Sequence, residues 1–265
     1  MLEIKNVYKT FNGGTINEKK ALRNLNLTLN DGDFVTVIGG NGAGKSTMLN
    51  MIAGVYPIDS GTIMVNETDV TGMKEHVRAR FLGRVFQDPM MGTAADMWIE
   101  ENMALAGRRG QKRGIRWAIT HKEREVFREK LKELELGLEN RLSTKVGLLS
   151  GGQRQALTLL MATMKRPDLL LLDEHTAALD PKTAAKVLAL TDKLIKEDGL
   201  TALMITHNMR DAIHYGNRLI MMNEGQIILD VCGEEKKKLT VEDLLAAFSR
   251  LSGSEFANDR ALLSN

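Results

Sequence analysis

Two glycine-rich stretches of this chain have the composition of phosphate-binding loops. The first is GGNGAGKST (39–47), which follows an apolar run and fits the pattern Gly-x-x-x-x-Gly-Lys-Ser. In this pattern, backbone N–H groups surround phosphates at the start of a helix, the lysine neutralises their charge and the serine hydroxyl binds Mg²⁺. We therefore expect nucleotide to bind to Gly39, Asn41, Gly42, Gly44, Lys45, Ser46 and Thr47.

The second stretch is LSGGQRQ (149–155), where Ser150 precedes the pair Gly151 and Gly152. A serine followed by two glycines also suits an anion, because its hydroxyl and its exposed backbone N–H groups are donors. One bound nucleotide needs only one phosphate loop. The second stretch therefore raises the question of which ligand it binds.

An acidic pair follows a third stretch, LLLLDE (169–174). Its four leucines predict a buried strand that delivers Asp173 to the carboxyl end of a sheet, where open α/β sheets bind ligands. An acidic pair at a strand end is by itself more often a solvated loop or a helix cap. With the phosphate loop upstream, we expect Asp173 to hold Mg²⁺ and Glu174 to act as the base for an attacking water.

The composition is that of an ordinary folded protein of 265 residues, with 43% hydrophobic and 26% charged residues. Its 36 basic and 34 acidic residues give a formal charge of +2, which is too close to balance to indicate a nucleic-acid partner. The single cysteine excludes an internal disulfide and favours a reducing compartment. The apolar runs are too short to cross a bilayer, so any membrane-spanning part belongs to another chain.

The elements that position these motifs alternate between strand and helix patterns, which predicts an α/β fold. Near-continuous apolar runs predict parallel strands at 34–39, 169–173 and 201–206. NLNLTL (24–29) and QIILDV (226–231) alternate apolar with polar residues, and we assign them to an antiparallel β subdomain. Helical patterns cover 45–53, 150–165, 181–197 and 208–215.

Helix signals replace strand signals from about 93 to 166. A capping box at Thr120 and Glu123 precedes apolar residues at helical spacing, namely Phe127, Leu131, Leu134 and Leu138. A last amphipathic helix is expected at 239–251. We therefore expect one domain over 1–253 with an α-helical subdomain inserted at about 93–166, and a tail at 254–265.

The order of these motifs resembles that of the ATP-binding-cassette (ABC) ATPases over nearly the whole chain. This resemblance implies a P-loop NTPase core with a mixed, mainly parallel sheet, an antiparallel β subdomain and an α-helical subdomain. In that family two cassettes pack head to tail. Ser150, Gly151 and Gly152 would close over the γ-phosphate of ATP held by a partner cassette, so that each glycine-rich loop serves a different nucleotide.

The resemblance also implies roles for single residues. Gln87 in VFQDP matches the glutamine that reaches Mg²⁺ and the water and touches a transmembrane partner, and His207 in MITHN matches the histidine that contacts the γ-phosphate. Asp180 matches the aspartate at the dimer seam, and Phe11 the aromatic that stacks on adenine, with Tyr8 as the competing candidate. The implied catalytic set is Lys45, Gln87, Glu174 and His207, and the implied metal ligands are Ser46, Gln87 and Asp173.

The chain departs from the family at His175, where proline usually follows the glutamate. A histidine restores a backbone donor and adds a titratable ring near the dimer seam. A tolerated substitution, a pH sensor and a positioning role for the seam remain open, and we do not assign a catalytic role.

Two further stretches each allow two interpretations. The basic segment 107–117 is either a solvated loop or a contact with anionic lipid or an acidic partner loop. Met90, Met91, Met97, Trp98 and Met103 either line a groove for a transmembrane partner or belong to the core.

The leading functional hypothesis is the ATPase subunit of a transporter at the cytoplasmic face of the membrane. The resemblance to bacterial importers implies Mg²⁺, an identical second cassette, separate permease subunits and an extracytoplasmic substrate-binding protein. The DEHTAALD segment and the basic insert resemble cassettes of tryptophan or tyrosine uptake systems. The alternative is a cytosolic ABC ATPase that serves iron–sulfur scaffold assembly, whereas a GTPase lacks support because no Asn-Lys-x-Asp segment is present.

Overall fold

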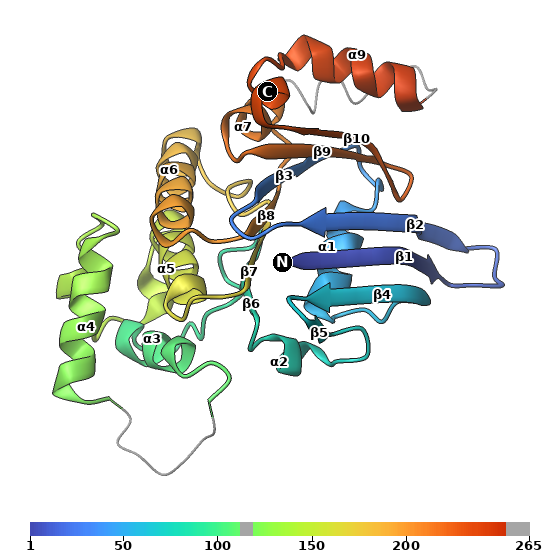
Figure 1. Ribbon diagram of the computed structural model, residues 1–265. Helices are drawn as coiled ribbons and strands as arrows, with labels where there is room; N and C mark the ends of the chain where they lie inside the picture. The colour runs from blue at the N-terminus through green and yellow to red at the C-terminus, as the bar shows by residue number, and fades with distance from the viewer. Residues whose placement is uncertain (112–118, 253–265) are drawn as a thin grey trace.

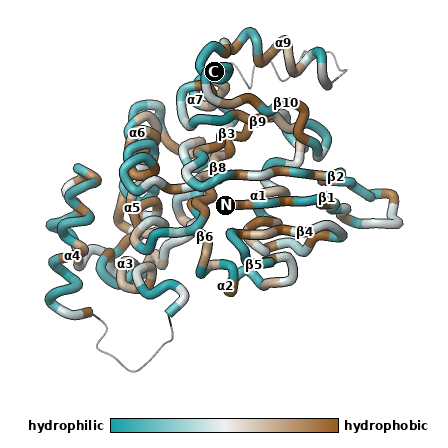
Figure 2. The backbone as a smooth tube through the Cα atoms, in the orientation of Figure 1, coloured by the Kyte–Doolittle hydropathy of each residue, from teal (hydrophilic) through white to brown (hydrophobic). Residues whose placement is uncertain are grey.

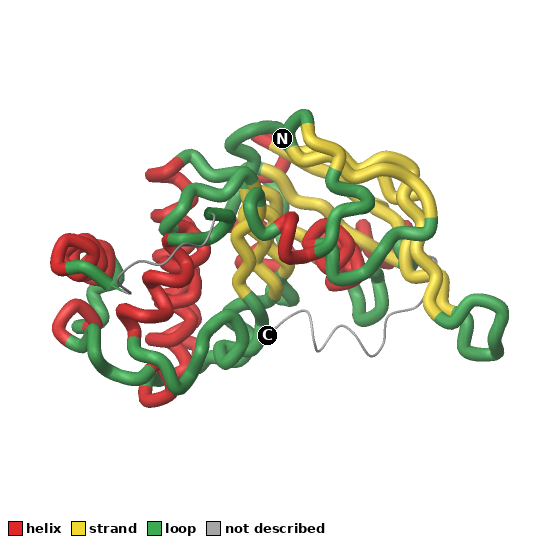
Figure 3. The backbone as a smooth tube through the Cα atoms, turned by 90° about the horizontal axis from the view of Figure 1, so that it is seen from below, coloured by secondary structure: helices red, strands yellow, loops and turns green. Residues whose placement is uncertain are grey.

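The computed structural model describes residues 1–111 and 119–252, which form two sheets and a group of helices (Figure 1). The helices α3 to α6 gather at one end of the molecule, and the strands β1, β2 and β4 lie at the other (Figures 1 and 3). Within these described ranges, no helix has both the length and the apolar character needed to cross a membrane.

The larger sheet has six strands in the order β10-β9-β3-β8-β7-β6. Its centre is β3 (Phe34–Ile38), β8 (Ala202–Ile205) and β7 (Leu169–Asp173), which are parallel as predicted. β9 (Arg218–Asn223) and β6 (Leu82–Val85) extend it in parallel on either side. All residues of β3 and β8 are buried, because helices or the second sheet cover both faces.

The second sheet is antiparallel and has four strands in the order β2-β1-β4-β5. Its strands are β1 (Leu2–Phe11), β2 (Lys19–Leu29), β4 (Ser60–Val65) and β5 (Thr68–Asp69). The inward leucines of β2 are buried and their polar neighbours exposed, as the alternation predicts. One assignment was wrong: β10 (Gln226–Cys232) is antiparallel but pairs with β9 at the edge of the larger sheet, because a tight turn at Glu224 and Gly225 returns the chain beside β9.

The first helix, α1 (Lys45–Ala53), lies between the two sheets and shares one hydrophobic core with them (Figure 1). Met48, Leu49 and Ile52 of this helix are fully buried. α2 (Glu75–Arg78) follows β5, and its Arg78 donates hydrogen bonds to the carbonyls of Met51 and Ile52 at the end of α1. The phosphate loop is therefore held from both ends, by β3 and by a buried helix.

Helices and turns, with one isolated β-bridge between Trp98 and Lys145, occupy the described residues between β6 and β7. The helices are α3 (Ile99–Gly107), α4 (His121–Lys132), two short 3₁₀ helices (Leu138–Asn140 and Val146–Leu148) and α5 (Gly151–Thr163). Thr120 and Glu123 form the expected capping box, and the four apolar residues that follow are buried. Most residues of α4 are hydrophilic, as the colour of its tube in Figure 2 shows, and only one stripe of this helix faces the core.

α6 (Pro181–Asp198) packs on α5 and on the central strands of the larger sheet. The helices that follow, α7 (Met209–His214), α8 (Gly233–Lys237) and α9 (Val241–Ser252), cover the β9 end of this sheet. The predicted last helix is present as α9, where the Asp243 N–H donates to the Thr240 hydroxyl, and Leu244 and Phe248 anchor it in the core. The expected tail at 254–265 lies outside the described residues.

Candidate functional site

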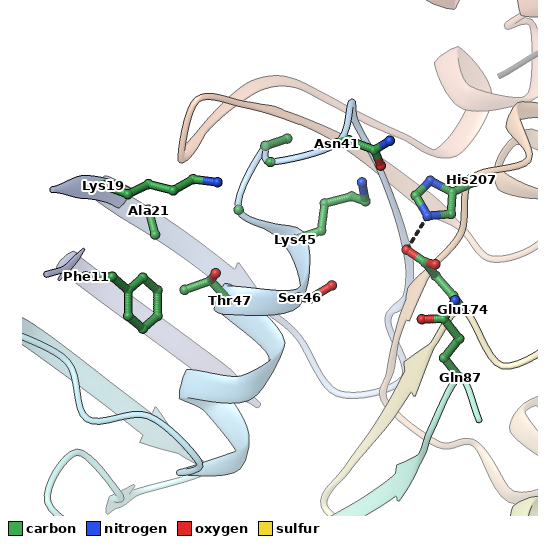
Figure 4. A pocket seen from close by; sticks show the side chains of 13 residues that line it. Phe11, Lys19, Ala21, Asn41, Lys45, Ser46, Thr47, Gln87, Glu174 and His207 are labelled. Atoms are coloured by element: carbon green, nitrogen blue, oxygen red, sulfur yellow. Dashed lines mark ion pairs between the residues drawn. The ribbon is translucent and has the colours of Figure 1, made fainter. Parts of the chain in front are cut away.

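One pocket lies between the phosphate loop and the ends of the central strands (Figure 4). Ten of the residues that line the pocket are labelled there, with Phe11 at one end and Glu174 and His207 at the other. The pocket is lined by Phe11, Lys19, Ala21, Asn41, Gly42, Ala43, Gly44, Lys45, Ser46, Thr47, Gln87, Glu174 and His207. The structure thus brings together nearly all residues expected to bind the nucleotide held by this chain.

The loop between β3 and α1 requires glycine at its two ends. Gly39 has φ 149°, and a Cβ there would overlap the carbonyl oxygen of Met222 on β9. Gly44 has φ 101°, and a Cβ there would lie 2.8 Å from the carbonyl oxygen of Ala21. Side chains are therefore excluded where the loop passes the neighbouring strands.

The start of α1 has the features of an anion-binding site. Gly44 is its N-cap, so no side chain accepts a hydrogen bond from the first N–H groups of the helix. The buried Lys45 places its Nζ 2.6 Å from the carbonyl oxygen of Gly39 and 3.1 Å from that of Gly40. The helix N-terminus and this ammonium group together supply the positive charge that phosphates require.

Glu174 is held opposite His207 at the other end of the pocket. Its Oε1 lies 2.6 Å from the Nε2 of His207, and its own backbone N–H donates to the carbonyl of Ile205 on β8. The glutamate is 8% exposed and has the left-handed backbone conformation, with φ 46°. This carboxylate can accept a proton from a water, and the contact with His207 orients the carboxylate.

Asp173 is next to the pocket and is paired with Arg84, which the sequence reasoning missed. The Arg84 Nη2 lies 3.7 Å from the Asp173 Oδ2 and donates to Asn50 on α1. Burial raises the pKa of Asp173, and the charge of Arg84 opposes this shift. The sequence of the strand at 82–85 does not show whether its arginine is paired inside the protein or exposed to solvent.

The oxygen donors near the loop fit Mg²⁺. The Ser46 hydroxyl and the Gln87 amide line the pocket, and Asp173 supplies one carboxylate beside it. The described residues contain no group of three or more His, Cys, Asp or Glu side chains that could hold a metal ion by themselves. A small number of oxygen ligands suits Mg²⁺, which usually keeps several waters and binds substrate phosphates.

Phe11 lies at the end of the pocket where a base would stack. Its ring meets that of Tyr56 edge-on, with 5.3 Å between centroids and an angle of 81°. Tyr8, the competing candidate, does not line the pocket. Lys19 and Ala21 of β2 were missed by the sequence reasoning, because their position follows from the pairing of β2 with β1 rather than from a motif.

The second glycine-rich stretch lies away from this pocket. Ser150 is the N-cap of α5: its Oγ accepts from the Gln153 N–H, and its own N–H donates to the Gln153 side chain. Ser150 and Gly151 are exposed, and neither they nor Gly152 line the pocket. Within one chain, the two loops therefore do not face the same ligand.

Gly152 has a packing role within the chain. It is buried, and a Cβ there would overlap the Cγ2 of Thr183 in the first turn of α6. At Gly151 a Cβ would make only an ordinary contact, 3.4 Å from Leu179. The two glycines therefore differ, since only the second one allows α5 and α6 to approach closely.

His175 points into the protein and away from the pocket. It is 1% exposed, and its Nε2 lies 3.0 Å from the Oγ1 of Thr191 on α6. Burial lowers the pKa of His175 to about 4, so the ring is neutral near pH 7. This environment speaks against the pH-sensor interpretation at physiological pH.

Within the basic segment 107–117, the two described arginines make contacts inside the chain. Arg109 donates to the carbonyls of Ala162 and Lys165 at the end of α5, and Arg108 pairs with Glu123. The other basic residues, Lys112, Arg113 and Arg116, lie outside the described residues together with Trp117.

The apolar residues after Gln87 do not share one environment. Met90 is 56% exposed, Met91 is 51% exposed and Trp98 is 42% exposed, whereas Met103 is fully buried. Met97 is half-buried. The core interpretation is therefore correct for Met103, and the groove interpretation stays a prediction for the three exposed residues.

A parallel sheet that carries a phosphate loop, an acidic strand end and a separate LSGGQ segment defines an ATP-hydrolysing nucleotide-binding cassette. The family model described as "ABC transporter" matches residues 22–177, and the chain belongs to this family.

The similarity to known relatives covers most of the chain, beyond the residues that the family model matches. The chain is 44% identical over 248 residues to the tyrosine transport ATP-binding protein of Clostridioides difficile, covering 94% of this chain and 98% of that protein. It is 33% identical to the phosphonates import ATP-binding protein PhnC of Alcaligenes faecalis, covering 87% and 82%. The dimeric post-hydrolysis structure of the cassette MJ0796 with ADP and Pi matches with a TM-score of 0.74 and 32% identity, covering 88% of this chain and 98% of that one.

Proposed function

We propose that this chain powers the import of an aromatic amino acid, with tyrosine as the first candidate, through separate permease subunits. The observation that carries the proposal is the identity of 44% to a tyrosine transport ATP-binding protein over nearly the full length of both chains. The relatives described above are transport proteins, which favours this function over iron–sulfur scaffold assembly. The near-balanced charge gives no support to a nucleic-acid partner.

In this proposal the two ends of the pocket contact different parts of ATP. Phe11 stacks on adenine, and the N-terminus of α1 and Lys45 bind the phosphates. Glu174 accepts the proton of the attacking water, and His207 and Gln87 contact the γ-phosphate end. Ser46, Asp173 and Gln87 would hold Mg²⁺, which neutralises charge on the phosphates when bound.

The active state we propose is a head-to-tail dimer of identical chains. Ser150, Gly151 and Gly152 of one copy would close over the γ-phosphate bound by the other, since none of them reaches the pocket of its own chain. Asp180 would lie at the seam. ATP then becomes part of the interface, and its hydrolysis removes contacts between the copies.

The permease would dock on the exposed surface after Gln87. Met90, Met91 and Trp98 present flexible and aromatic apolar groups there, and such residues suit an adaptable protein contact. This docking would hold the chain at the cytoplasmic face of the membrane. An extracytoplasmic substrate-binding protein would then reach the system through the permease.

The decisive test of the site uses Glu174→Gln. We expect ATP turnover to fall by roughly 10²- to 10⁴-fold, the usual contribution of a positioned base. ATP binding should remain, and light scattering should detect an ATP-dependent dimer. Adding Ser150→Arg should return that variant to a monomer that still binds ATP. Normal turnover in Glu174→Gln, or a dimer unaffected by Ser150→Arg, would contradict the assignment.

The substrate is tested with the permease that co-purifies with this chain. The complex, reconstituted in liposomes with its binding protein, should show higher ATP turnover with tyrosine than with spermidine or a phosphonate. Glu174→Gln in the same complex is the control. Equal stimulation by all three solutes would remove the proposed specificity.

A further inference from the structure

The residue after Glu174 links the catalytic turn to the middle of α6. His175 is the buried member of the segment 175–180, whose other residues are half-buried or exposed. Its partner Thr191 is also 1% exposed and is the eleventh residue of α6, about 15 Å along the helix from Pro181. The His175 side chain therefore connects the first residue of the segment 175–180 directly to the middle of α6.

The hydrogen-bond pattern fixes which tautomer His175 has. Thr191 Oγ1 lies 2.8 Å from the carbonyl oxygen of Val187, which can only accept. The hydroxyl of Thr191 has one hydrogen, and that hydrogen is used in this bond. The contact of 3.0 Å to His175 therefore needs a hydrogen from the ring, so Nε2 carries the proton and donates to Thr191.

The turn that this bond attaches has the catalytic carboxylate at one end and the dimer seam at the other. Ala177 N–H donates to the Glu174 carbonyl, and Leu179 N–H donates to the Thr176 carbonyl. Glu174 itself has φ 46°, a left-handed conformation that is uncommon for a residue with a side chain. Such a conformation persists only where the surrounding structure fixes it.

We propose that the hydrogen bond from His175 to Thr191 is a strut that positions the Glu174 carboxylate opposite His207. This inference rests on the proposed role of Glu174 as the base. His175 is a positioning residue, because it faces away from the pocket and acts through the backbone of its neighbour. Release of the strut lets the left-handed backbone relax, which moves the carboxylate away from the water it must activate.

The main test is Thr191→Val, which keeps the volume of the side chain and leaves His175 in place. We expect kcat to fall about 10-fold with an unchanged KM for ATP, since a shift of about 1 Å can cost up to 100-fold in rate. Thr191→Ser keeps the acceptor and should restore kcat. Long-range ¹H–¹⁵N spectra of the wild-type chain should show the Nε2–H tautomer of His175, with the signal altered in Thr191→Val.

Thr163→Val is the matched control, because Thr163 is also buried in a helix and also donates to a carbonyl four residues earlier. It should leave kcat unchanged. Equal kcat values for Thr191→Val and Thr163→Val, or an Nδ1–H tautomer in the wild type, would overturn the strut. Full turnover in Glu174→Gln would instead show that the proposed base is wrong, so the two failures are distinguishable.

Discussion

The close packing of Gly152 on Thr183 makes a quantitative prediction about Gly152→Ala. The added methyl group would lie more than about 1 Å inside the normal separation of carbon atoms from the Cγ2 of Thr183. Overpacking of this kind costs about 1–3 kcal/mol, and the better helix propensity of alanine recovers up to about 1 kcal/mol. We expect Gly152→Ala to lower the free energy of unfolding by about 1–2 kcal/mol, or Tm by about 2–8 °C.

The assay is urea and thermal unfolding of four variants. Thr183→Ala removes the overlapping methyl group but keeps the backbone N–H that donates to Asp180, so it should be nearly neutral by itself. The double variant Gly152→Ala with Thr183→Ala should therefore regain most of the lost stability. Gly151→Ala is the matched control, since its methyl group meets only an ordinary contact. A double variant as unstable as Gly152→Ala would refute the packing argument.

The same variants separate the packing role of Gly152 from its proposed role at a partner's nucleotide. If the double variant is stable but hydrolyses ATP slowly, the glycine has a second function at the dimer seam. If stability and turnover recover together, packing within the chain accounts for the requirement. Both quantities can be measured on the same purified samples.

Three further predictions concern single side chains. Lys45→Ala removes a charged donor and should weaken ATP binding by roughly 10- to 100-fold in a fluorescence titration. Phe11→Ala should weaken the binding of ATP and GTP alike by roughly 5- to 150-fold, and Phe11→Tyr should not. Burial lowers the pKa of Lys236 to about 8, so between pH 8 and 10.5 the unfolded chain binds more protons and the folded state gains stability with rising pH. Because carbonyl acceptors of Tyr215 and Gly216 also stabilise the ammonium, we expect a gain of about 1–2 kcal/mol by urea unfolding, which Lys236→Met should abolish.

The fold was largely predictable because its signals are local. The run LLLLD (169–173) and its two apolar partners could be buried on both faces only as neighbouring parallel strands, and the structure confirms this. The capping box at Thr120 was correct because a cap depends on residues three positions apart. The sheet membership of β10 was not predictable, since alternation defines a wet face but does not identify the neighbouring strand.

The candidate site was predictable only where a motif carries its own geometry. The loop 39–47 is such a case, because its glycines, lysine and helix start are contiguous in sequence. Lys19 and Arg84 were missed because each reaches the site through strand pairing, which no sequence motif shows: Lys19 pairs with Phe11, and Arg84 lies beside Asp173. The burial of His175 was equally hidden, since its partner Thr191 is on the next helix and no spacing rule connects the two.

The contacts of α6 connect the LSGGQ segment to the turn that follows Glu174. Thr183 in its first turn packs on Gly152 of the LSGGQ segment, and Thr191 holds His175 beside the catalytic carboxylate. Both contacts are to one continuous helix, which resists bending because its backbone hydrogen bonds are internal. In the proposed dimer, a displacement of the LSGGQ segment by a partner's nucleotide would therefore be transmitted to the turn after Glu174. Each chain could in this way adjust its own hydrolysis to the occupancy of its neighbour, without any side chain that touches both ligands.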